Sequence, residues 1–209
     1  MGVYLNPGNV DFQEVLNSKI YVDKSELIQY TNSVLRTTQK YICVSRPRRF
    51  GKSMAANMLT AYYSRGCDSR EMFQGLKIAK YTCFEKHLNQ YNVIHLNMRD
   101  YLTESENMKQ LIQFVEEDLL DELQQEFADL RMPRRKTLVK VLEQAFAQYK
   151  IPFVFVIDEW DCIFRVHKSD AASQKTYLDF LRNLLKDKSY IALAYMTGIL
   201  PIKKYGEHS

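Results

Sequence analysis

Residues 45–53 read Ser-Arg-Pro-Arg-Arg-Phe-Gly-Lys-Ser, and this stretch decides the fold. Before it, Lys40–Ser45 contains a short apolar run that is typical of a buried strand. After it, Lys52–Ser64 places its apolar residues at helical spacing. A loop between a strand and a helix directs backbone N–H groups and the positive end of the helix toward an anion. The sequence therefore predicts a phosphate-binding loop at this place.

The residue types in this stretch suit phosphate chemistry. In the usual pattern, a glycine precedes a lysine that spans the outer phosphates and a Ser or Thr whose hydroxyl holds Mg²⁺. Gly51, Lys52 and Ser53 fill these positions. The pattern also has a glycine five residues before Gly51, where this chain has Arg46. A surface turn with a basic tip is therefore the alternative interpretation.

A second signal follows the apolar run Phe153–Ile157, which predicts a strand buried on both faces. Asp158 and Glu159 come directly after it, at the end of the strand where ligands of open parallel sheets bind. Asp158 can hold Mg²⁺ together with Ser53, and Glu159 can orient or deprotonate an attacking water. By themselves, these two carboxylates also fit a solvated loop. A nucleotide site, however, needs such carboxylates together with a phosphate-binding loop, and this chain has both. We predict that the nucleotide contacts come from Arg46, Pro47, Arg48, Arg49, Phe50, Gly51, Lys52, Ser53, Met54 and Asp158.

Two further groups of side chains have alternative roles. Thr197, at the end of a predicted strand, either bonds the γ-phosphate or the attacking water, or simply ends the strand. With Glu159 and Lys52, it completes the predicted catalytic set. The three loop arginines can bind phosphates, pair with carboxylates or stay in solvent, and a phosphate or carboxylate contact is favoured because they lie inside the loop.

Strands and helices alternate along the rest of the chain. Apolar runs at Asn92–Asn97, Phe153–Ile157 and Tyr190–Met196 predict three further strands. Apolar residues at helical spacing predict helices between them, and Thr103 with Glu106 forms a capping-box pair at the start of one helix. Such alternation is typical of βαβ units, so we expect an α/β fold with a mostly parallel sheet.

The composition is that of an ordinary globular protein. Apolar residues make up 46% and charged residues 26% of the 209 residues, which excludes a disordered or low-complexity chain. The longest apolar stretches, Ile151–Ile157 and Ile191–Met196, are far shorter than the roughly 20 residues of a membrane span, and no secretion signal is visible. The four cysteines show no ligand spacing. We therefore expect a reduced, cytoplasmic protein without a membrane contact.

Four stretches together resemble the bacterial AAA-ATPase-like family. They are Tyr21-Val-Asp-Lys-Ser25, residues 45–53, Ile157-Asp-Glu-Trp-Asp161 and Thr197-Gly-Ile-Leu-Pro-Ile-Lys-Lys-Tyr-Gly206. Members of that family usually read Tyr-Val-Asp-Lys-Thr, Ser-Arg-Pro-Arg-Arg-Phe-Gly-Lys-Ser and Asp-Glu-Tyr-Asp at the first three places. The missing first glycine is the rule in that family, so Arg46 no longer counts against the site.

The resemblance implies a three-layer P-loop NTPase core of the additional-strand class, with ATP and Mg²⁺ as its ligands. It implies that Asp158 is the acid on the Mg²⁺ side, Glu159 the candidate base and Thr197 a sensor. We interpret residues 1–209 as an N-terminal arm and helix (1–36) followed by a partial ATPase core (37–209). Family members usually continue into a nuclease-like domain. We expect that domain and the last core strand to be absent here, which would leave Lys40–Ser45 at an open sheet edge and slow the hydrolysis.

Two classes of function remain open. The first is slow Mg²⁺-dependent hydrolysis of ATP. The second is a nucleotide-gated interaction module that binds ATP, hydrolyses little and signals to a protein partner or a second copy of the chain. A link to DNA or mobile elements rests only on what longer relatives carry, since a net charge of +4 does not argue for nucleic acid. Tyr21, Asp23 and Lys24 either wall the adenine side of the site or pin the N-terminal arm, and pinning is favoured.

Overall fold

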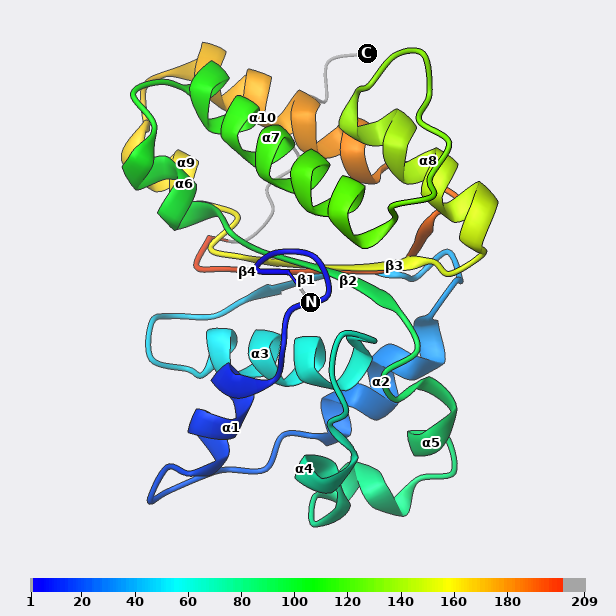
Figure 1. Cartoon of the computed structure of the whole chain (residues 1–209). Helices are drawn as coiled ribbons and strands as arrows, with labels where there is room; N and C mark the ends of the chain where they lie inside the picture. Colours follow the sequence, from blue (N-terminus) through cyan, green and yellow to red (C-terminus); the bar gives the residue numbers. More distant parts are fainter. Residues whose placement is uncertain (1, 201–209) are drawn as a thin grey trace.

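A four-stranded sheet lies at the centre of the molecule, with helices on both of its faces (Figure 1). The computed structural model describes residues 2–200. The strands follow the order β1-β4-β3-β2, and every neighbouring pair is parallel. Their bounds are β1 (Tyr41–Ser45), β2 (Asn92–Asn97), β3 (Phe153–Asp158) and β4 (Ile191–Gly198). The predicted α/β fold with a parallel sheet is confirmed.

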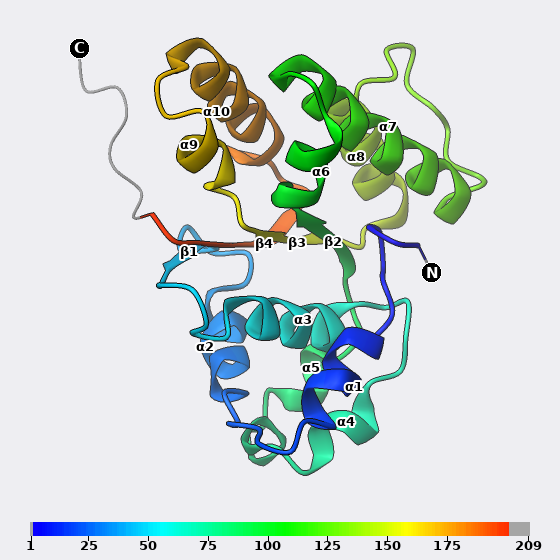
Figure 2. The same ribbon diagram turned by 90° about the vertical axis from the view of Figure 1, so that its left-hand side faces the viewer.

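The helices form two layers that sandwich the sheet, as Figure 2 shows from the side. One layer holds α1 (Val10–Leu16), α2 (Glu26–Val34), α3 (Lys52–Tyr63), α4 (Arg70–Gln74), the 3-10 helix η1 (Lys77–Lys80) and α5 (Phe84–His87). The other layer holds α6 (Met98–Glu104), α7 (Met108–Glu126), α8 (Leu138–Tyr149), α9 (Cys162–Val166) and α10 (Ala171–Leu185). None of the helices in residues 2–200 has the length and the apolar character that crossing a membrane needs.

Both helical layers cover strand β3, one on each face of the sheet. All six of its residues are buried. Phe153, Phe155 and Ile157 pack into an apolar cluster with residues of α6 to α10, whereas Val154 and Val156 pack into a second cluster with residues of α1 to α5. A strand covered on both faces gains from apolar side chains at every position, which accounts for its continuous apolar sequence.

The two edges of the sheet differ. Along β2, the N-terminal residues run antiparallel, with Leu5 opposite Ile94, the Asn6 amide donating to the Val93 carbonyl at 2.7 Å, and the His95 amide donating to the Tyr4 carbonyl at 2.9 Å. Along β1, residues 2–200 provide no outer strand. Within the described part of the chain, β1 is thus an edge strand. Its five residues are exposed or half-buried, so the strand predicted at Lys40–Ser45 is present but is not buried.

The beginning of α7 differs from the prediction. Asn107 caps this helix, because its side chain accepts a hydrogen bond from the Gln110 amide at 3.0 Å. Thr103 instead lies in the last turn of α6, where its hydroxyl donates to the Arg99 carbonyl at 2.9 Å. The capping-box prediction is thus wrong, since a short helix that the periodicity did not reveal already contains Thr103. Pro201-Ile-Lys-Lys-Tyr-Gly206, from the last of the four stretches quoted above, lies outside the described residues.

The burial of β2 yields a stability prediction. Ile94 is 0% exposed between the sheet and the layer of α6 to α10. We expect Ile94→Ala to lower the free energy of unfolding by about 2–5 kcal/mol, because it leaves a cavity. Urea denaturation followed by circular dichroism measures this loss. Ile20→Ala is the matched control, since Ile20 is 81% exposed, and a comparable loss in that variant would contradict the interpretation.

Candidate functional site

The candidate residues meet at one edge of the sheet, where three strands end. β1 leads into the loop that begins at Arg46, β3 ends at Asp158 and β4 ends at Gly198. Because the strands are parallel, their carboxyl ends lie at the same edge of the sheet. The register pairs Val44 with Thr197, so that Thr197 lies beside the start of the loop.

The loop enters α3 through Gly51. This residue has a φ of +73°, in the left-handed region that favours glycine, and it is the N-cap of α3 without a side-chain cap hydrogen bond. A Cβ at this position would lie 3.2 Å from the Lys24 Nζ atom. The first N–H groups of α3 therefore have no side-chain acceptor at the cap, and they suit an anion placed beyond the end of the helix.

Lys52 is folded back onto the loop. Its Nζ atom donates a hydrogen bond to the Pro47 carbonyl at 3.0 Å, and the residue is only 8% exposed. A neutral carbonyl is a weaker partner for an ammonium group than a phosphate oxygen is. An anion in the loop can therefore take over this hydrogen bond without a large movement of the chain.

Asp158 is the centre of the polar contacts at this edge. Its Oδ2 atom accepts a hydrogen bond from the Ser53 hydroxyl, and its Oδ1 atom accepts one from the Thr197 hydroxyl. The Glu159 amide donates a further hydrogen bond to Oδ1 at 2.9 Å. Asp158 is 5% exposed and Thr197 is buried, whereas Ser53 is exposed. The cluster thus joins β3, β4 and α3, and it opens to solvent at Ser53.

The contact between Ser53 and Asp158 fits a magnesium ion. Hydroxyl and carboxylate oxygens are hard ligands, and Mg²⁺ usually combines one or two protein ligands with phosphate oxygens and water. Because the Ser53 hydroxyl touches the Asp158 carboxylate, both oxygens can reach one cation. These two residues are the ones that would hold the ion.

Glu159 has a partner that sequence reasoning missed. Its φ is +53°, and its Oε2 atom accepts a hydrogen bond from the Arg165 Nη2 atom. The two side chains are 19% and 16% exposed. The Arg165 Nη2 atom also lies 3.4 Å from Asp161 Oδ1. No motif marks Arg165, whose position in the helix that follows the two carboxylates was the available signal.

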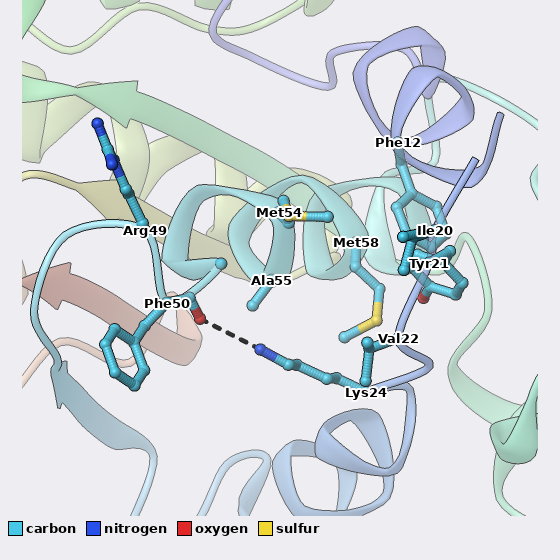
Figure 3. Close-up of a pocket in the computed structure, with 11 residues that line it drawn as sticks. Phe12, Ile20, Tyr21, Val22, Lys24, Arg49, Phe50, Met54, Ala55 and Met58 are labelled. Atoms are coloured by element: carbon cyan, nitrogen blue, oxygen red, sulfur yellow. Dashed lines mark hydrogen bonds between the residues drawn. The ribbon is translucent and has the colours of Figure 1, made fainter. Parts of the chain in front are cut away.

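A cavity of about 400 Å³ opens beside the loop, between α3 and the N-terminal arm (Figure 3). Apolar side chains of both segments line it, with Lys24 and the loop at one end: Phe12, Ile20, Tyr21, Val22, Met54, Ala55 and Met58. Burial, followed by the nearby charge of Asp23, raises the pKa of Tyr21 to about 12, so the phenol stays neutral. The cavity is therefore an apolar recess next to the loop of residues 45–53.

The residues of the N-terminal motif lie in two different places. Tyr21 and Lys24 line the cavity, and the Lys24 Nζ atom donates to the Phe50 carbonyl at 3.1 Å (Figure 3). Asp23 points elsewhere, since its carboxylate accepts hydrogen bonds from the Ser25 and Lys77 amides, both at 2.8 Å. Asp23 pins the arm to the helical layer, and Tyr21 and Lys24 face the loop.

A family comparison agrees with this arrangement. The model of the AAA-ATPase-like family, described as "Predicted AAA-ATPase", matches residues 7–206. The chain belongs to this family. None of the curated proteins with which the chain was compared matches it. Membership of the AAA-ATPase-like family supports nucleotide binding in general.

The three loop arginines of this AAA-ATPase-like chain are exposed: Arg46, Arg48 and Arg49. Within residues 2–200, none of them pairs with a carboxylate, and Arg165 takes the place next to Glu159 and Asp161 instead. Arg46 contacts the sheet through its backbone, because its amide donates to the Gly198 carbonyl at 3.1 Å. The arginine side chains are therefore free to meet an anion from solvent.

The left-handed conformation of Gly51 generates a second prediction. We expect Gly51→Ala to lower the free energy of unfolding by about 1–2 kcal/mol, because an L-residue is strained in that conformation. Chemical denaturation measures the change. Gly75→Ala is the control, since Gly75 has a φ of −86° and a Cβ there would meet nothing within 4 Å. Equal effects of the two substitutions would contradict the prediction.

Proposed function

We propose that this protein binds ATP with Mg²⁺ at the loop of residues 45–53 and slowly hydrolyses it. The observation that carries the proposal is the meeting of Lys52, Ser53 and Asp158 at one edge of the sheet. These are a cation for the phosphates and two oxygen ligands for a metal ion. Membership of the AAA-ATPase-like family supports the same conclusion.

The phosphates bind at the N-terminus of α3 in this proposal. The backbone amides of Phe50 to Met54 surround them, and the left-handed Gly51 keeps a side chain out of their way. Lys52 exchanges the neutral Pro47 carbonyl for the outer phosphates, and its hydrogen bond then has a charged acceptor as well as a charged donor. Arg46, Arg48 and Arg49 add positive charge around the entrance.

Ser53 and Asp158 hold the Mg²⁺ ion, which neutralises negative charge that develops on the phosphates. To do so, the Ser53 hydroxyl gives up its hydrogen bond to Asp158 Oδ2. Thr197 and the Glu159 amide keep their hydrogen bonds to Oδ1, so the carboxylate does not rotate away. Thr197 thereby orients Asp158 from the neighbouring strand.

Glu159 is the base in the proposed reaction. The oxygen of an attacking water bonds to the γ-phosphorus while the bond from that phosphorus to the bridging oxygen of ADP breaks, and Glu159 accepts the proton of the water. Catalysis of this kind depends on positioning and on charge stabilisation. An arginine from a partner often completes the charge stabilisation in phosphoryl transfer. We expect slow turnover by the isolated chain.

The cavity beside the loop takes the base of the nucleotide. Its apolar walls on α3 and the arm suit a flat, weakly polar ring, and Tyr21 offers an aromatic face. Lys24 lies between this cavity and the loop, at the place where the base and the phosphates of one ligand would be joined.

A nucleotide-gated interaction module is the second candidate function. The edge of β1 favours it, because no strand of residues 2–200 pairs with its outer side and because β1 leads directly into the loop at Arg46. An unpaired strand edge can bind another strand. Nucleotide binding in the loop and pairing along β1 would then influence each other, and the partner or second copy of the chain would sense the nucleotide. A role connected to nucleic acid stays a prediction.

Removal of the Lys52 ammonium tests the proposed phosphate site. We expect Lys52→Ala to weaken the binding of MgATP, measured by calorimetry, by about 10- to 100-fold, because a charged hydrogen bond contributes about 1.5–3 kcal/mol. Lys175→Ala is the control, since the Lys175 side chain is 78% exposed and pairs with Asp179 on the surface of α10. Equal affinities of the Lys52 and Lys175 variants would refute the site.

Measurements of phosphate release from MgATP distinguish the two candidate functions. We expect Glu159→Gln to bind MgATP like the wild type and to lose turnover by about 100-fold or more, because the proton acceptor is missing. Tight binding by a wild-type chain without any phosphate release would contradict the hydrolysis and leave the interaction module.

Partial filling of the cavity tests the position of the base. Ala55 lies on α3 at the wall of the cavity and is 9% exposed. We expect Ala55→Leu to weaken the binding of MgATP by about tenfold or more through steric conflict with the base. Binding of inorganic triphosphate should not change. Ala172→Leu, at an exposed position of α10, is the control. Equal weakening of both ligands would show that the substitution acts on the loop instead.

A further inference from the structure

We infer that Arg165 is a positioning residue that holds Glu159 in the orientation it needs to accept a proton from the attacking water. This inference rests on the proposed function, in which Glu159 is the base. Arg165 is not part of the sequence motifs that indicate the site.

The local backbone makes such a partner necessary. Glu159 has a φ of +53°, which L-residues rarely adopt, and it lies between the buried end of β3 and the turn before α9. Its amide is fixed on Asp158 Oδ1 at 2.9 Å. The backbone therefore fixes where the side chain begins, but three rotatable bonds still separate the carboxylate from the chain. The hydrogen bond from Arg165 to Oε2 removes much of that freedom.

Arg165 is itself held by Asp161. Its Nη2 atom lies 3.4 Å from Asp161 Oδ1, and its backbone amide donates to the Asp161 carbonyl at 3.3 Å. The Asp161 side chain is 0% exposed. The second oxygen of Asp161, Oδ2, accepts hydrogen bonds from the amides of Ile199 at 2.9 Å and Leu200 at 2.6 Å. A continuous series of contacts thus connects the end of β4 with Glu159.

The charges in this series also favour a positioning role. Asp161 and Glu159 are both acidic, and the single guanidinium between them offsets their mutual repulsion. Because the guanidinium is planar and has several donors, it can contact two carboxylates at once, which an ammonium does less well. Within residues 2–200, the other carboxylate oxygen of Glu159, Oε1, makes no hydrogen bond. That oxygen is the one left to accept a proton from water.

The experiment measures phosphate release at saturating MgATP and the dissociation constant of MgATP for a set of full-length variants. The set contains the wild type, Arg165→Gln, Arg165→Lys, Glu159→Gln and the combinations of each Arg165 substitution with Glu159→Gln. Arg182→Gln serves as the control, because Arg182 is 63% exposed and pairs with Asp179 on the surface of α10. Circular dichroism checks that each variant is folded.

We expect Arg165→Gln to lower the rate by up to about 100-fold, because a small displacement of a catalytic group has effects of this size. The dissociation constant should stay near that of the wild type, and Arg165→Lys should show an intermediate rate. In the Glu159→Gln background, either Arg165 substitution should leave the rate unchanged, since Arg165 acts through Glu159. If Arg165→Gln does not fold because Asp161 loses its counter-charge, the Arg165→Lys pair makes the same comparison.

Three results would overturn the role of Arg165 alone. The first is a higher rate in Arg165→Gln, which would mean that the ion pair restrains Glu159 from reacting, and the second is an unchanged rate in both Arg165 variants. The third is an equal decrease of the rate in the Glu159→Gln background, which would mean that Arg165 acts through the fold. A wild-type chain that does not bind MgATP, or a Glu159→Gln variant that hydrolyses it normally, would instead refute the proposed function. The two failures are therefore distinguishable.

Discussion

The carboxylate of Asp158 is the interaction on which the rest of the site depends. A charge that is 5% exposed is costly unless hydrogen bonds satisfy it, and here the donors come from three segments: the Ser53 hydroxyl of α3, the Thr197 hydroxyl of β4 and the amide of Glu159. A shift of β4 by one residue against β3 would turn Thr197 to the other face of the sheet. The contacts of this carboxylate thus also fix the register of two strands and the position of α3.

The same edge of the sheet contains unusual backbone conformations. Arg49, Gly51 and Glu159 have φ values of +69°, +73° and +53°. Such conformations cost free energy in L-residues, and they persist where the surrounding contacts determine them. At Gly51 the glycine removes most of the cost, whereas at Glu159 the amide contact with Asp158 and the guanidinium of Arg165 hold the residue in place. Rigid strand ends and constrained turns therefore set the positions of the polar groups before any ligand arrives.

The sequence predicted the strands well and the short helices poorly, for a physical reason. All four strands lie within one or two residues of their predicted ranges. For β2, β3 and β4 the reason is that strands covered on both faces of a parallel sheet require nearly continuous apolar runs, whereas the edge strand β1 is exposed or half-buried. Helices such as α6 (7 residues) and α9 (5 residues) are too short for a 3.6-residue period to become visible. The start of α7 was misplaced for that reason, since Thr103 belongs to the preceding α6 and Asn107 provides the cap. The sequence did not predict the order of the strands, and only the edge position of Lys40–Ser45 was expected, from the family resemblance.

In the candidate site, too, some residues could be predicted from the sequence and others could not. Lys52, Ser53 and Asp158 could be predicted because each lies in a short motif whose spacing is set by the geometry of one strand end or one helix start. The cavity could not, because Tyr21 and Lys24 reach the loop only after the N-terminal arm has folded against α3. Arg165 is the instructive intermediate case: it is only six residues from Glu159, yet the contact requires a left-handed turn at Glu159 that no propensity favours. The sequence alone therefore did not reveal this ion pair, because it depends on a backbone conformation that tertiary contacts impose. The structure was needed to place Arg165 beside Glu159.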